Sequence, residues 1–92
     1  NKNIITDVYA QTLTNLAHLL LRQESSICDS RARDMLKKVV ESSFDLADAL
    51  YGYVLYEGKG GMKDRTGGLR YMRKAADRGD LMARQFLRNY GY

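Results

Sequence analysis

The sequence contains no proline and no tryptophan, and only one cysteine and one histidine. The single cysteine, Cys28, cannot form a disulfide within the chain and leaves the redox compartment undecided. The single histidine, His18, has no cysteine or carboxylate beside it at the spacing of a zinc site, so we expect neither a metal nor a cofactor. Apolar runs such as 19–21 and 53–56 contain only three or four residues, far fewer than the roughly 20 that cross a bilayer. The composition therefore argues against a disulfide scaffold, a zinc-stabilised fold and a membrane-spanning helix.

Motifs of enzymatic chemistry are equally scarce. No serine lies in a nucleophile-elbow pattern, and the serine pairs at 25–26 and 42–43 are typical of turns. The glycine-rich run 58–61 superficially resembles a phosphate-binding loop, but it lies between two expected helices and lacks the Lys-Ser/Thr pair that completes such a loop. We interpret Cys28 as a small apolar residue beneath a loop, because no cation adjoins it to activate the thiol. The sequence predicts a protein without catalytic activity.

Helical periodicity dominates what is present. Apolar residues recur three or four positions apart, as amphipathic helices require, in two groups: Leu13, Leu16, Leu19 and Leu20, and Ala47, Tyr51, Val54 and Leu55. Glycines at 58–61 and at position 79 are expected to end helices, since glycine adopts the left-handed conformation without steric cost. The pattern predicts about five antiparallel helices and no sheet, with the helices near 4–22, 30–42, 46–57, 66–78 and 81–90.

Polar residues before the second and fourth helices are candidate N-caps. Asp29 or Ser30 is expected to cap the second helix, and Asp64 or Thr66 the fourth. The adjacent glycines at 67–68 fall inside the fourth helix, where each costs roughly 1 kcal/mol relative to alanine. We therefore expect the fourth helix to start late or to fray.

The sequence also repeats itself at a spacing in the thirties. Ala83 follows Ala47 by 36 positions, and Lys38 precedes Lys74 by the same interval. Such a period in a mostly helical chain is typical of a helical-hairpin solenoid. Residues 47–83 resemble a Sel-one-like repeat, a relative of the tetratricopeptide repeat. The positions that carry the resemblance are Ala47, Gly52, Leu55, Gly58, Gly60, Asp64, Lys74, Ala75, Ala76, Gly79 and Ala83.

The resemblance implies one all-α domain over residues 1–92, a short right-handed α-α superhelix of the tetratricopeptide-like type. Unit one would span about 12–46, unit two 47–82, and a capping helix 83–92. Unit one matches weakly, because residues 24–29 replace the glycine loop. Arg88 takes the place of a small residue in the cap, so no further helix is expected to pack closely beyond it.

The resemblance also implies where a partner binds. In stacked hairpins of this type the first helices line the concave surface, which is the usual ligand face. The chain has seven tyrosines; Tyr51 and Tyr71 are expected in the core, whereas tyrosines on the concave face would anchor a partner, as they do at many protein interfaces. The predicted partner-binding residues are His18, Leu21, Tyr53, Tyr56, Gln85, Asn89 and Tyr92.

Positive charge is concentrated in the second half of the chain. Residues 1–46 carry six basic and six acidic side chains, whereas residues 47–92 carry nine basic and five acidic ones, so the net charge of +4 arises there. Arg70, Lys74 and Arg78 recur every fourth residue and should line one face of the fourth helix. With Arg73 they could attract nucleic acid or another anionic surface. We favour a solvated outer face, because the charge is mild and no aromatic residues interleave it.

Two functional hypotheses follow. The first is a non-enzymatic protein–protein interaction module that holds a protein segment on its concave face; the resemblance implies an adaptor, with bacterial inhibitor or immunity proteins and envelope-complex components as subtypes. The alternative is an accessory nucleic-acid or anionic-surface binder that acts through the basic helix.

The chain begins at Asn1 without a methionine, so the question whether an export signal was removed stays open. Periplasmic and cytoplasmic locations are both compatible with the sequence.

Overall fold

The protein folds into helices throughout the part of the chain that the structure, a computed structural model, describes: residues 7–42 and 45–91. These ranges contain no strand, which confirms the all-α class. The elements in chain order are α1 (Asp7–Leu21), α2 (Ser26–Glu41), α3 (Asp48–Glu57), α4 (Arg65–Asp77), α5 (Leu81–Phe86) and a single π-helical turn, η1 (Leu87–Gly91). None of the described helices is both long enough and apolar enough to cross a membrane.

The start of α2 was predicted wrongly. The helix begins at Ser26, because the Ser25 side chain caps it by accepting a hydrogen bond from the Cys28 backbone N–H at 3.4 Å. Asp29 therefore lies within the first turn, where its negative charge complements the helix dipole. Cys28 is helical as well, so it does not lie in a loop. The six-residue loop expected at 24–29 is shorter than its polar composition indicated.

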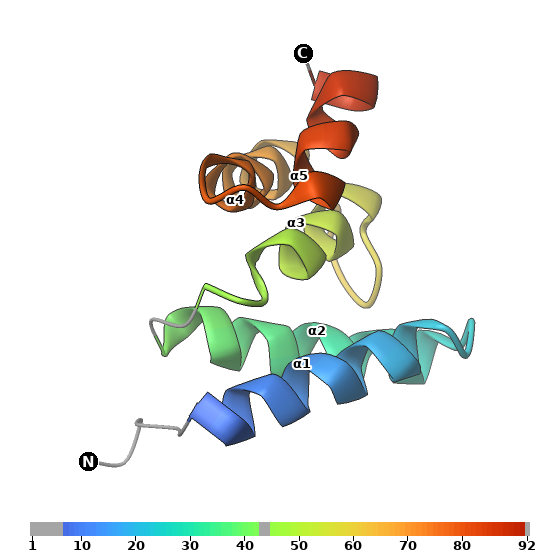
Figure 1. The fold of residues 1–92 in the computed structure, drawn as a ribbon. Helices are drawn as coiled ribbons and strands as arrows, with labels where there is room; N and C mark the ends of the chain where they lie inside the picture. Colours follow the sequence, from blue (N-terminus) through green and yellow to red (C-terminus); the bar gives the residue numbers. More distant parts are fainter. Residues whose placement is uncertain (1–6, 43–44, 92) are drawn as a thin grey trace.

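Two helical hairpins and a C-terminal extension make up the fold. Helices α1 and α2 lie side by side and antiparallel, α3 crosses above them and pairs with α4, and α5 with η1 continues away from the first hairpin (Figure 1). The core has two clusters of buried residues. The first joins α1, α2 and α3 through Ala10, Leu13, Ala17, Ala32, Leu36, Val39, Ala47, Tyr51, Val54 and Leu55. The second joins α3, α4 and α5 through Ala49, Met72, Ala75 and Ala83. Helix α3 thus contributes to both.

The backbones of α3 and α4 approach each other closely at Gly52 and Gly68. A Cβ atom on Gly52 would lie 2.7 Å from the Gly68 carbonyl oxygen, and a Cβ on Gly68 would lie 2.7 Å from that of Gly52. Neither position has room for a side chain, since real Cβ atoms do not approach backbone oxygens so closely. Gly68 therefore permits the packing of α4 against α3.

The expectation that α4 starts late was wrong for the same reason. The helix begins at Arg65, ahead of both glycines, and the Asp64 carboxylate accepts a hydrogen bond from the Gly67 N–H at 2.9 Å. This N-cap satisfies one of the free donors of the first turn. Capping and tertiary packing against Gly52 together outweigh the low helix propensity of the glycine pair.

The loop between α3 and α4 attaches the second hairpin to the first. It hangs from the end of α3 toward α2 (Figure 1), where the Arg33 guanidinium donates a hydrogen bond to the Lys59 carbonyl at 3.3 Å. Gly60 has a φ of 73°, and a Cβ there would overlap the backbone of Asp29. Gly60 is thus required both by its backbone conformation and by its contact with α2. Gly58 and Gly79 likewise follow helix ends with positive φ, as expected.

We predict that Gly52→Ala destabilises the protein, although alanine is the better helix former. Its methyl group would push against the Gly68 carbonyl, so the free energy of unfolding should fall by about 1–3 kcal/mol. Helix propensity alone would raise it by about 0.8–1.0 kcal/mol. Urea denaturation followed by circular dichroism measures the difference. Gly61→Ala is the comparison: a Cβ there meets the Arg33 guanidinium and no helix backbone, so its cost should not exceed the roughly 0.5–1.5 kcal/mol of the Arg33–Lys59 hydrogen bond. A gain in stability for Gly52→Ala would show that the helices do not meet at this point.

Candidate functional site

Two adjoining grooves are hollowed into the side of the molecule that α1, α3 and α5 share. The first has a volume of about 530 Å³ and is lined by His18, Leu21, Arg22, Glu24, Leu50, Tyr53, Lys59 and Met82. The second has a volume of about 260 Å³ and is lined by Tyr53, Met72, Met82, Gln85, Phe86, Asn89 and Tyr90. Tyr53 and Met82 line both grooves, so these two side chains stand at the junction between them.

The grooves bring together five of the seven residues that the sequence marks as partner-binding. His18, Leu21 and Tyr53 line the first groove, and Tyr53, Gln85 and Asn89 line the second. They come from α1, α3, α5 and η1, which correspond to the first helices of the units expected from the repeat. The concave surface that the resemblance implies thus includes five side chains that line these grooves.

The other two predicted residues do not line a groove. Tyr92 lies outside the described residues. Tyr56 is half-buried and packs edge-to-face on Phe86, with ring centroids 5.0 Å apart, and contacts the ring of Tyr90 at 6.0 Å. The Arg65 guanidinium covers the Tyr56 ring at 5.4 Å from its centroid. Such aromatic and cation–π contacts stabilise packing, so Tyr56 holds the C-terminal helix against α3.

Several lining residues escaped the sequence reasoning. Met82 precedes Gln85 by three positions and Asn89 by seven, and this helical spacing places all three on one face. The periodicity could therefore have revealed Met82. Arg22, Glu24 and Lys59 lie beyond the ends of α1 and α3, where no helical period applies. Glu24 even has a left-handed backbone, with φ of 55°, so only the folded chain shows where it lies.

The first groove combines an apolar surface with charge at its margin. Leu21 and Leu50 pack partly against the core, and Met82 remains 52% exposed. The side chains of Arg22 and Lys59 form no ion pair or hydrogen bond within residues 7–42 and 45–91. An apolar floor with a few polar groups at its edge is suited to binding, since apolar area supplies affinity and polar groups set orientation. No cluster of three or more potential metal-ligating side chains occurs among the described residues.

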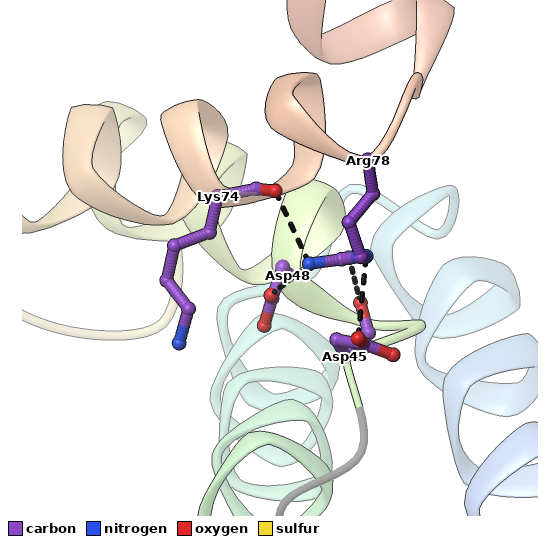
Figure 2. Close-up of polar contacts among 4 residues, drawn as sticks. All are labelled: Asp45, Asp48, Lys74 and Arg78. Carbon is purple, nitrogen blue, oxygen red and sulfur yellow. Dashed lines mark hydrogen bonds and ion pairs between the residues drawn. The ribbon is translucent and has the colours of Figure 1, made fainter.

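The basic face of α4, the alternative site, is largely engaged in internal contacts. Arg78 donates from Nη1 to a carboxylate oxygen of Asp48 at 3.0 Å, and its Nε lies 3.3 Å from the Asp45 carboxylate (Figure 2). It also donates to the backbone carbonyls of Asp45 and Lys74. The Lys74 ammonium lies over the Tyr71 ring, 5.4 Å from its centroid. The Asp45 and Asp48 carboxylates therefore offset the charge of Arg78 in the stripe that the spacing of Arg70, Lys74 and Arg78 predicted.

Burial changes the titration of two groups on α3. Asp48 is 2% exposed, and this desolvation raises the pKa of its carboxyl, although the hydrogen bond from Arg78 and the charge of Lys74 lower it. Burial and the neighbouring Tyr71 raise the pKa of the Tyr51 hydroxyl. Tyr51 is buried and meets Tyr71 edge-to-face at 5.0 Å. Tyr51 thus lies in the core, as expected.

Comparison of the chain with protein-family models, with curated protein sequences and with solved structures finds no match.

We predict that Arg78→Gln destabilises the fold more than the same change at Arg70. The loss of Arg78 leaves a buried carboxylate without its cation, which should lower the free energy of unfolding by about 1–3 kcal/mol. Arg70 is exposed on the same helix, so Arg70→Gln should change stability by about 0.5 kcal/mol or less. Adding Asp48→Asn to Arg78→Gln should restore part of the loss. Equal melting temperatures for the two single variants would contradict a stabilising role of the ion pair.

A second prediction concerns pH. Because the pKa of Asp48 is raised from its ordinary value of 3.8, the folded protein binds a proton at higher pH than the unfolded chain does. The contribution of Asp48 to stability is therefore fully present below pH 3.8 and decreases as the pH rises through the folded-state pKa. Urea unfolding of the wild type and Asp48→Asn across this range isolates the effect: the stability of the wild type relative to the variant should decline with rising pH. A relative gain would mean that Arg78 outweighs desolvation.

Proposed function

We propose that this chain is a non-enzymatic protein-interaction module that binds a protein segment in the two grooves beside Tyr53. The observation that carries the proposal is the convergence of groove residues from α1, α3, α5 and η1. In this proposal the chain is a short right-handed α-α superhelix of Sel-one-like repeats. It acts as an adaptor, and an immunity-type inhibitor or an envelope-complex component are the subtypes that the resemblance favours.

The distribution of the lining residues supports a solenoid-like surface. Met72 is the only lining residue of either groove that belongs to α2 or α4. In a stack of helical hairpins the first helices line one surface and the second helices cover the other, so this asymmetry is typical of the concave side. The two grooves also adjoin each other across the two hairpins, because Tyr53 and Met82 line both.

The chemistry of the grooves favours protein as the ligand. Tyrosine and methionine are enriched at protein interfaces, where they supply large apolar area. His18, Gln85 and Asn89 line the grooves and are exposed, and they carry donors and acceptors for the backbone of a bound segment. The basic helix is the weaker candidate, because Arg78 is already paired with Asp45 and Asp48.

Peptides selected from a displayed random library provide the test. We expect Met82→Ala and Tyr53→Ala to weaken their binding by about 2 kcal/mol, as truncation of interface anchors does. Fluorescence anisotropy of labelled selected peptides measures the change. Tyr53 also packs against both core clusters, so thermal melts must accompany that variant; Met82 is half exposed and its truncation should leave the fold intact.

Met62→Ala is the matched control, since Met62 is 83% exposed in the α3–α4 loop and lines neither groove. Its affinity should equal that of the wild type. A library that gives no binder, or binders equally affected by Met62→Ala and Met82→Ala, would overturn the proposal.

A further inference from the structure

We propose that the segment bound in these grooves is extended and acidic: it carries a carboxylate side chain that meets Arg22 and Lys59, followed or preceded by a large apolar side chain at the Tyr53–Met82 junction. The inference rests on the proposed function and specifies the chemical class of the partner. It combines two observations: cations in the lining of the first groove that have no ion-pair partner among the described residues, and an apolar junction shared with the second groove.

The cations are free to pair with a ligand. Arg22 follows the last turn of α1 and Lys59 follows α3, so two separate segments of the chain bring positive charge to the lining of the first groove. Neither side chain forms an ion pair or hydrogen bond in the described part of the chain. Glu24 is the sole carboxylate among the residues lining the first groove, which leaves an excess of positive charge there.

Arg78 provides an internal comparison. It also lies beyond the end of a helix, but it is held by two carboxylates of this chain, Asp45 and Asp48. The positive charges at the groove have no such internal partners among the described residues, so they are the ones available to a carboxylate from outside. The net charge of +4 adds a long-range attraction for an acidic segment, which raises its association rate.

The shape of the site favours an extended segment. The grooves hold about 530 and 260 Å³, volumes close to those of ordinary ligand pockets. They meet at Tyr53 and Met82, so one chain can occupy both. The second groove is lined mainly by apolar and aromatic residues with the amides of Gln85 and Asn89 at its edge. An apolar side chain at the junction, with the backbone continuing past these amides, satisfies both the apolar surface and the hydrogen-bonding groups.

The test begins with the same displayed library of random peptides, selected on the wild-type protein. We expect enrichment of sequences in which Asp or Glu lies near a Leu, Ile, Met or Phe. For one such peptide, replacing Asp by Asn and Glu by Gln should weaken binding about tenfold. The double variant Arg22→Gln/Lys59→Gln should bind the acidic and the neutral peptide equally, so the two effects are not additive.

The control is Lys38→Gln/Arg70→Gln, which removes the same charge from residues that line neither groove. It should retain the tenfold preference for the acidic peptide, apart from a small loss shared by all charge-reducing variants. Circular dichroism of both double variants should match the wild type, since Arg22 and Lys38 are exposed and Lys59 forms hydrogen bonds through its backbone N–H and carbonyl rather than its side chain.

Two outcomes distinguish a failure of this inference from a failure of the proposed function. Selected peptides that depend on Met82 but lack acidic residues, or that lose the same affinity in both double variants, would overturn the acidic partner and leave the binding function standing. A selection that enriches no Met82-dependent peptide would overturn both.

Discussion

The contact between Gly52 and Gly68 is the constraint on which the arrangement of the grooves depends. Because neither residue has a side chain, the backbones of α3 and α4 meet directly. This contact orients α3 so that Tyr53, the residue next to Gly52, lines both grooves and Tyr56, one turn further, packs on Phe86. A side chain at either glycine would separate the helices and displace both tyrosines from these positions.

The ion pair between Asp48 and Arg78 holds the same hairpin at its open end. Asp48 begins α3 and Arg78 follows α4, so the pair lies opposite the connecting loop. The hairpin is therefore held at three points: the loop, the glycine crossing and the ion pair. Burial of Asp48 raises the pKa of its carboxyl.

Arg78 pairs with carboxylates of this chain, whereas the cations that line the first groove are Arg22 and Lys59.

Much of the helix layout was predictable from local features. Glycine positions located the ends of α3 and α4, Asp64 was recognised as a candidate cap, and the spacing of apolar residues identified the core face that includes Ala47, Tyr51 and Leu55. The start of α2 was missed because Ser25 and Asp29 are both suitable capping residues, and only the folded backbone shows which side chain reaches a free N–H. Met82 was missed although its helical spacing from Gln85 and Asn89 was visible.

The sequence by itself determined the class of the fold and which side chains share a helix face, because helix periodicity, capping and glycine punctuation act over a few neighbouring residues. The resemblance to a helical repeat, rather than periodicity, suggested that His18, Tyr53, Gln85 and Asn89 share a surface, and these residues line the two grooves. Only the tertiary structure decided that Arg78 pairs with Asp48, thirty residues earlier in the chain. It also decided that Arg22 and Lys59, from two separate segments, line the same groove. The reason is physical: pairing and desolvation depend on distances between segments remote in sequence, and local propensity carries no information about those distances.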